Sequence, residues 1–179
     1  YMIFKLQDID VSLVNGLRRT IYSQIKTVGF RTEPYDMNDV NIIINDSPLH
    51  DQFLAHRFGM IPIHIEKPEE FNVDDYEFII KRENDTNNSI DITSQDIKIR
   101  RLSDNHILLE RETRKMFPPD PITKGFILIT RLKPSNNSKK ESTKLHIIAK
   151  ASISNGEENS RWCPVSCSSY SFIRDSEKI

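Results

Sequence analysis

The 179-residue chain contains few glycines, and their spacing excludes several familiar kinds of site. The five glycines are Gly16, Gly29, Gly59, Gly125 and Gly156. No two of them lie close enough to form a G-x-G-x-x-G loop, a Walker phosphate loop or the G-x-S-x-G turn of a serine hydrolase. The sequence therefore excludes nucleotide binding by a standard glycine loop.

Cysteine is scarcer, with only Cys163 and Cys167 in the chain. The sequence has neither a C-x-x-C pair nor an H-E-x-x-H pair, so the commonest zinc signatures and the thioredoxin-type redox site are absent. Two cysteines without further sulfur partners indicate buried or inert thiols. We therefore expect no metal ion and no cofactor to be held by these cysteines.

Long apolar runs and an excess of charge of one sign are also missing. No window approaches the roughly 18 to 20 apolar residues that a membrane-spanning helix requires, so we expect no membrane contact. The 25 basic and 26 acidic side chains give a formal charge of −1. Such a chain lacks the positive field that sequence-independent DNA binding needs, so nucleic acid is expected to be reached only through partners. With residue 1 taken as near the true start, the absence of a secretory signal predicts an intracellular protein.

The first part of the chain predicts a strand followed by an amphipathic helix. Residues 2–6 alternate between apolar and polar side chains, as a half-buried strand does. Asp10 is a suitable N-cap for a helix over 11–25. Apolar side chains then recur every four residues along one face of this helix, at Leu13, Leu17, Ile21 and Ile25, and Val14 and Tyr22 widen this stripe. Gly29 is expected to end the connection after the helix through a positive φ.

The remainder of the chain predicts one more helix and many short strands. An apolar, β-branched run over 40–44 predicts a strand, and Ser47 with Pro48 predicts the start of a second helix that ends before Gly59. Further β-like runs lie at 61–65, 76–80, 97–99, 106–109, 126–132 and 144–153. This order of elements predicts an α+β fold.

Two segments carry a resemblance to a known family. Residues 10–21 read DVSLVNGLRRTI, and residues 51–63 read DQFLAHRFGMIPI. Together with the runs at 126–132 and 144–151, the segment RWCPV at 161–165 and Tyr170, they resemble the assembly subunit of multisubunit DNA-directed RNA polymerases. This family comprises the third-largest subunit of eukaryotic RNA polymerase II, its counterpart in polymerases I and III, and the corresponding archaeal subunit.

The resemblance implies a discontinuous α/β dimerisation domain interrupted by a mainly antiparallel-β insert domain. The first part would be residues 1–30, the insert 31–163, and the second part would begin at 164–179. The family's long C-terminal helix has no counterpart before residue 179, so the chain is expected to be a fragment or to continue elsewhere. The implied partners are a smaller homologous assembly subunit and the two largest polymerase subunits. No catalytic residue is implied for this chain. A nuclear location is implied, or the cytoplasm or virion for a viral member, whose AT-rich genome would suit the abundant Asn, Ile, Lys and Ser.

The resemblance also implies the residues that contact partners. The apolar stripe of the first helix (Leu13, Leu17, Ile21 and Ile25) would pack against the smaller subunit. The polar residues Asn15, Arg18 and Arg19 of the same helix would contact the large subunits, as would His56 and Arg57 of the second helix. From the residues alone, the stripe can equally be ordinary core and the arginines a solvated helix face.

Other functions have weaker support in the sequence. His50, Asp51, His56 and His64 could be considered for a metal site. His50 and His56 stand six residues apart, however, and so do not share a helix face as metal ligands at i, i+3 or i+4 do. A hydrolase or transferase built from these histidines is disfavoured because no nucleophile, base and orienting group form a recognisable set. A dimerising scaffold or adaptor with no polymerase role remains as the alternative.

Overall fold

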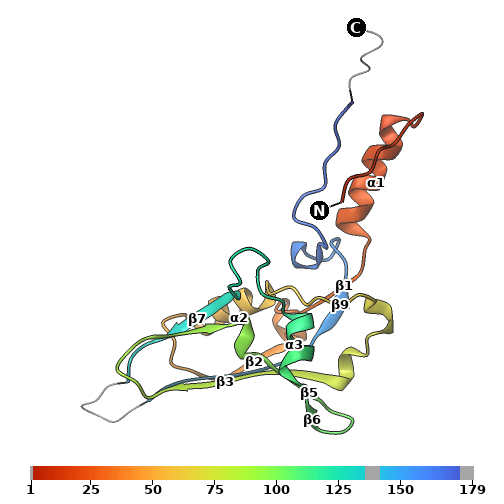
Figure 1. Ribbon diagram of the computed structural model, residues 1–179. Helices are drawn as coiled ribbons and strands as arrows, with labels where there is room; N and C mark the ends of the chain where they lie inside the picture. The colour runs from red at the N-terminus through yellow and green to blue at the C-terminus, as the bar shows by residue number, and fades with distance from the viewer. Residues whose placement is uncertain (1, 136–141, 174–179) are drawn as a thin grey trace.

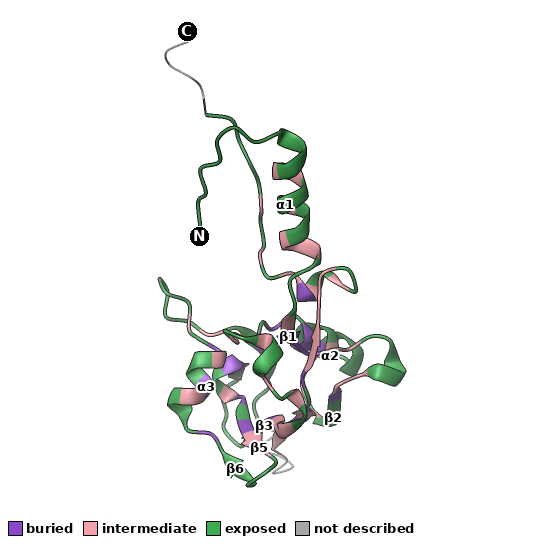
Figure 2. Ribbon diagram, turned by 90° about the vertical axis from the view of Figure 1, so that its right-hand side faces the viewer, coloured by how far each residue is buried: buried purple, intermediate pink, exposed green. Residues whose placement is uncertain are grey.

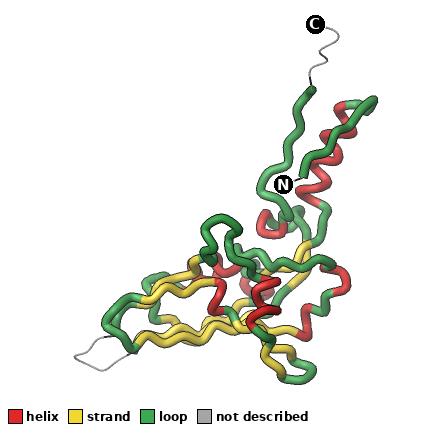
Figure 3. Tube along the Cα trace, in the orientation of Figure 1, coloured by secondary structure: helices red, strands yellow, loops and turns green. Residues whose placement is uncertain are grey.

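The computed structural model describes residues 2–135 and 142–173 (Figure 1). Its first helix, α1, projects from a β-rich part of the molecule (Figures 1 and 3). This β-rich part, residues 27–163, is called the body below. The helices are α1 (Val11–Ser23), α2 (Asp51–Gly59) and α3 (Glu110–Met116). The strands are β1 (Thr27–Gly29), β2 (Val40–Asn45), β3 (Tyr76–Asn84), β4 (Ile90–Thr93), β5 (Lys98–Arg101), β6 (His106–Ile107), β7 (Leu128–Leu132), β8 (Thr143–Ala149) and β9 (Ser152–Ser154).

The strands form three antiparallel sheets within the described residues. The largest has the order β2-β8-β3-β5-β6, and two-stranded sheets join β4 to β7 and β1 to β9. The long strand β3 lies at the centre of the large sheet because it pairs with β8 on one side and β5 on the other. Helices combined with mainly antiparallel sheets confirm the predicted α+β class.

The core lies between the large sheet and α2. Leu54 and Phe58 of α2 are fully buried, and four phenylalanine rings pack in series through this layer. Phe30 contacts Phe58 at 4.6 Å and Phe78 at 5.1 Å between ring centroids, and Phe78 contacts Phe117 at 6.0 Å. The last two contacts are edge-to-face, a favoured arrangement of aromatic pairs. All of this burial lies in the body, whereas α1 has no buried residue (Figure 2).

The first helix begins as its sequence predicts. The Asp10 carboxylate accepts a hydrogen bond from the Ser12 backbone N–H at 2.8 Å, which satisfies one of the free donors of the first turn. Hydrogen bonding from the Ser12 side chain, together with this backbone bond, lowers the pKa of the Asp10 carboxyl. The helix ends at Ser23 with Gln24 as its C-cap, so Ile25 lies just beyond it.

Two of the predicted strands are wrong. Residues 2–6 are not a strand: Met2, Ile3 and Phe4 are 85%, 80% and 70% exposed, and no strand of the described chain pairs with them. A strand needs a hydrogen-bonding neighbour, which alternation of side chains cannot supply. Residues 61–65 also run without strand pairing, although Ile61 and Ile63 are buried in the core.

The predicted roles of two turn signals are also wrong. Gly29 has no positive φ and lies in β1. Glycine is needed here because of close packing: a Cβ at position 29 would lie 2.9 Å from Cζ3 of Trp162. The second helix starts at Asp51 rather than at Pro48, and its N-cap is His50 instead of Ser47.

Candidate partner interface

The predicted apolar stripe is exposed on α1. Leu13 is 67% exposed, Leu17 50% and Ile25 44%, while Ile21 is half-buried. These are large fractions for leucine and isoleucine in a helix, whose apolar face normally packs against a core. The stripe is therefore not ordinary core of the described chain.

The side of α1 that carries Tyr22, which the sequence predicts as part of the widened stripe, contacts its own chain. The Tyr22 hydroxyl accepts a hydrogen bond from the Ser168 backbone N–H at 2.6 Å, and the Tyr22 carbonyl accepts one from Cys163 Sγ at 3.4 Å. Tyr22 follows Leu17 by five residues, which is about 140° around a helix of 3.6 residues per turn. Leu17 therefore points well away from the segment that holds Tyr22.

The base of α1 is fixed to the body by a small set of contacts. Gln24 Nε2 donates to Glu157 Oε1 at 2.5 Å, and Thr27 Oγ1 donates to the Trp162 carbonyl at 2.8 Å. The pairing of β1 with β9 continues this attachment. Among the described residues these bonds hold the C-terminal end of the helix, and its N-terminal end extends away from the body (Figure 2).

Further exposed apolar side chains lie at this end of the molecule. The segments before α1 and after Cys163 run on the same side of the body as the helix (Figures 1 and 2). Tyr170 and Phe172 contact each other edge-to-face at 6.1 Å, yet they are 44% and 76% exposed. The exposed set comprises Met2, Ile3, Phe4, Leu6, Ile9, Leu13, Leu17, Ile25, Tyr170, Phe172 and Ile173 and is called the α1 surface below. Exposed apolar side chains gathered at one end of a folded protein are typical of an interaction site.

The polar residues predicted on α1 lie on other sides of the helix than Leu17: Asn15 and Arg19 are each about 160° from it and Arg18 is about 100° from it. Arg18 Nε donates to Asn15 Oδ1 at 3.0 Å, which orients the half-buried guanidinium along the helix. Arg19 is exposed. Gly16 has no atom outside its own helix backbone and sequence neighbours within 4 Å of a Cβ placed on it, so a second backbone has room to approach there.

His56 and Arg57 lie apart from this group, on α2 in the body. Both are exposed, and Arg57 Nη2 donates to the Leu128 carbonyl of β7 at 2.9 Å. They occupy the last turn of α2, where positive charge is favourable beside the free carbonyls. The structure thus brings the α1 residues together and places His56 and Arg57 on a separate surface.

The histidines and cysteines considered for a metal site do not form one among the described residues. His50 Nδ1 accepts from the Gln52 backbone N–H at 3.3 Å and so caps α2. Residues 2–135 and 142–173 contain no group of three or more His, Cys, Asp or Glu side chains that could hold a metal ion. Both cysteines are free thiols. Cys163 is half-buried and Cys167 is exposed, so the prediction of buried or inert thiols stays a prediction for Cys167.

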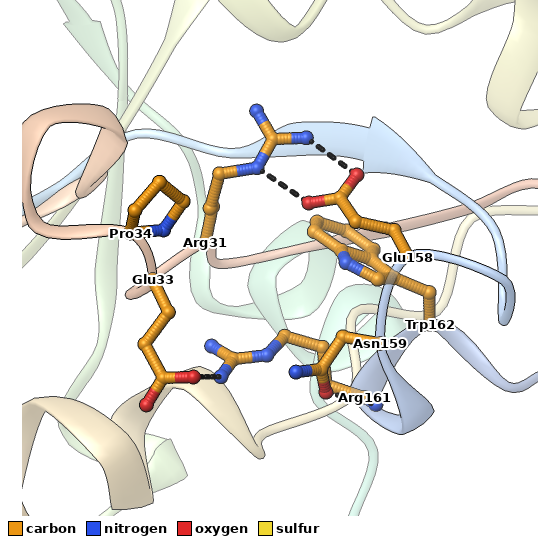
Figure 4. A pocket seen from close by; sticks show the side chains of 7 residues that line it. All are labelled: Arg31, Glu33, Pro34, Glu158, Asn159, Arg161 and Trp162. Carbon is orange, nitrogen blue, oxygen red and sulfur yellow. Dashed lines mark hydrogen bonds and ion pairs between the residues drawn. The ribbon is translucent and has the colours of Figure 1, made fainter.

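A hollow beside the base of α1 contains functional groups that sequence reasoning did not select. It is lined by Arg31, Glu33, Pro34, Glu158, Asn159, Arg161 and Trp162 (Figure 4). Arg31 donates two hydrogen bonds to the Glu158 carboxylate, from Nε and Nη2, both at 2.9 Å. The hydrogen bond from Arg31, with a further one from Ser154, lowers the pKa of the Glu158 carboxyl. The sequence feature that could have pointed to this hollow is the adjacent pair Arg161-Trp162, which begins the RWCPV segment.

Comparison with known proteins identifies the class of protein. No family model matches the chain. The relatives include the subunit 3 of RNA polymerases II, IV and V from Arabidopsis thaliana, 27% identical over 98% of this chain and 54% of the relative. RNA polymerase II subunit rpb3 of Dictyostelium discoideum is 26% identical over 96% of this chain and 54% of the relative. A conjugation stage-specific protein of Tetrahymena thermophila is 27% identical over 94% and 54%.

The predicted resemblance is thereby confirmed. The chain is a relative of the third subunit of DNA-directed RNA polymerases over most of its described length. These matches cover almost the whole of this chain but only about half the length of the curated relatives. Within the described ranges, no helix has the length and apolar character needed to cross a membrane.

Proposed function

We propose that this chain is a non-catalytic subunit of a DNA-dependent RNA polymerase that forms a heterodimer with a smaller homologous subunit. The observation that carries this proposal is the apolar stripe of α1, which the described residues leave uncovered at Leu13, 67% exposed, and at Leu17, 50% exposed. Similarity to polymerase subunit 3 proteins supports the same role. In this proposal the stripe packs against a helix of the smaller subunit, so that one core is divided between two chains.

The energetics of the helix support a protein partner. Full burial of a leucine or isoleucine side chain contributes about 1.5 to 3 kcal/mol. At Leu13 and Leu17, half or more of the side-chain surface is still exposed to water. An isolated helix of about 12 to 15 residues is marginal in water without packing. The 13-residue α1 is therefore expected to gain much of its stability from the heterodimer.

The polar residues are assigned to a second step of assembly. Asn15, Arg18 and Arg19 contact the two largest subunits beside the heterodimer, because guanidinium groups pair well with carboxylates and carbonyls of another protein. His56 and Arg57 provide a separate contact from α2. Nucleic acid is reached only through the assembled complex.

The domain organisation follows the same proposal. Residues 1–30 and 164–179 belong to the dimerisation domain, and residues 31–163 form the insert. Of the second part, only 164–173 lie within the described residues. The chain itself supplies no catalytic residue, and it works inside the cell, in the nucleus or, for a viral polymerase, in the cytoplasm or virion.

Affinity purification from the source cells followed by mass spectrometry tests the proposal. A tagged chain is expected to recover a small homologous subunit and the two largest polymerase subunits in stoichiometric yield. Recovery of a stable partner without polymerase chains would overturn the polymerase role and favour the dimerising scaffold. Recovery of the chain alone would overturn both.

A further inference from the structure

The hollow beside the base of α1 contains a buried guanidinium whose ion pair with a carboxylate is long. The Arg161 side chain is only 4% exposed. Its Nη1 donates to the Phe30 carbonyl at 3.2 Å and to the Thr32 hydroxyl, which are both neutral acceptors. The nearest carboxylate oxygen is Glu33 Oε2, 3.9 Å from Nη2 and beyond hydrogen-bond distance. A buried charge of this kind is costly unless it is paired.

Arg31, the other arginine of the hollow, is hydrogen-bonded directly to a carboxylate. Arg31 has its own carboxylate, Glu158, on two hydrogen bonds of 2.9 Å. Its guanidinium carbon also lies 5.8 Å from the centre of the Trp162 ring, which holds it over the indole. Arg161 is therefore the arginine of the hollow whose carboxylate partner lies beyond hydrogen-bond distance.

A second buried donor borders the same space. Trp162 is 1% exposed, and its Nε1 has no hydrogen-bond partner. In Figure 4 this nitrogen is turned toward the space between Arg31, Glu33 and Arg161. Buried indole N–H groups normally find an acceptor, so an acceptor is missing on the side of the hollow formed by Trp162.

We propose that this hollow binds a single carboxylate group, that of an acidic side chain on a partner polypeptide. Glu33 shows how a carboxylate can approach, since its own carboxylate lies 3.9 Å from Arg161 Nη2 (Figure 4). Glu33 is 66% exposed and can be displaced by an acid that fits better. The planar guanidinium matches a carboxylate in a two-point pairing. A doubly charged phosphate is disfavoured because Glu33 and Glu158 also line the hollow.

The site is independent of the α1 surface and can be tested on the purified chain. Trp162 is the only tryptophan, so the single indole N–H resonance in an NMR spectrum reports on the hollow. The probes are sodium acetate and a blocked Gly-Glu-Gly tripeptide. Acetamide and sodium chloride at matched ionic strength are the controls for shape and for salt. Sodium phosphate is the competing anion.

Two matched variants sharpen the test. Glu33→Gln removes the competing carboxylate from an exposed side chain, and Asp85→Asn removes one negative charge from the exposed loop between β3 and β4. Acetate and the tripeptide are expected to shift the indole resonance saturably. Binding should be roughly two- to fivefold tighter in Glu33→Gln, the effect of removing a partly exposed ion pair. Asp85→Asn should bind as the unaltered chain does.

The proposal is overturned if neither carboxylate gives a saturable shift in the unaltered chain or in Glu33→Gln. It is equally overturned if acetamide or chloride gives the same shift, if phosphate binds and acetate does not, or if both variants bind alike. Binding of acetate without the tripeptide would overturn the polypeptide source. Because no polymerase subunit is present in this assay, its outcome is separate from that of the assembly role.

Discussion

Leu17→Asp tests the division of α1 into a side held by its own chain and a side left for a partner. Leu17 is 50% exposed, so about half of the 1.5 to 3 kcal/mol of a buried leucine remains available to the heterodimer. An aspartate would in addition bring an unpaired charge into the interface, at a cost of about 3 to 5 kcal/mol. The sum of about 4 to 6 kcal/mol corresponds to a Kd roughly a thousandfold weaker or more, since each 1.4 kcal/mol is a factor of ten.

Isothermal titration with the smaller subunit measures this effect. The matched control is Ser12→Asp, which places the same charge on the same helix about 140° away from Leu17. Ser12 is exposed, so this variant should bind with nearly unchanged Kd. Far-UV circular dichroism of both variants checks that the chain remains folded. An unchanged Kd for Leu17→Asp would refute the assignment of the stripe to the heterodimer.

Three further predictions concern assembly, packing and pH. Replacing both Arg18 and Arg19 by alanine should leave the heterodimer intact on size exclusion but reduce recovery of the large subunits; equal loss of both steps would contradict the proposed order. Gly29→Ala should lower the free energy of unfolding by about 1 to 3 kcal/mol, because its methyl group would collide with the Trp162 ring, and a urea denaturation curve measures this. The lowered pKa of Glu158 contributes stability that is present above the ordinary carboxyl pKa of 4.5 and is lost as the pH falls through the lower folded value. Urea midpoints at about pH 5 and about pH 3 should therefore differ less in Glu158→Gln, and an equal difference would contradict this contribution.

The elements that the sequence predicts well are those with a local cause. Asp10 caps α1 because its carboxylate reaches an N–H two residues away, and this requires nothing from the remainder of the chain. The run at 40–44 forms β2 because its β-branched side chains favour an extended backbone. The exposed stripe of α1 is also visible in the sequence, although only the structure shows that no other segment of the described chain covers it.

The missed elements depend on distant contacts. The short helix α3 has a charged sequence without a clear apolar stripe, and its only buried residue is Thr113. The glycine at 29 looks like a turn signal until Trp162, more than a hundred residues later, is placed against it. The carboxylate-binding hollow is likewise assembled from residues 31–34 and 158–162, so no local pattern could reveal it.

The pairing of β1 with β9 has a consequence for how the molecule can be engineered. Thr27 faces Ser154, so the chain enters and leaves the β-rich portion at neighbouring points. A segment whose two ends meet in this way can be lengthened, shortened or exchanged while the parts outside it keep their mutual placement. Inserting a different compact domain between these two strands would therefore give a chimaera that retains the projecting helix and carries the new domain beside it.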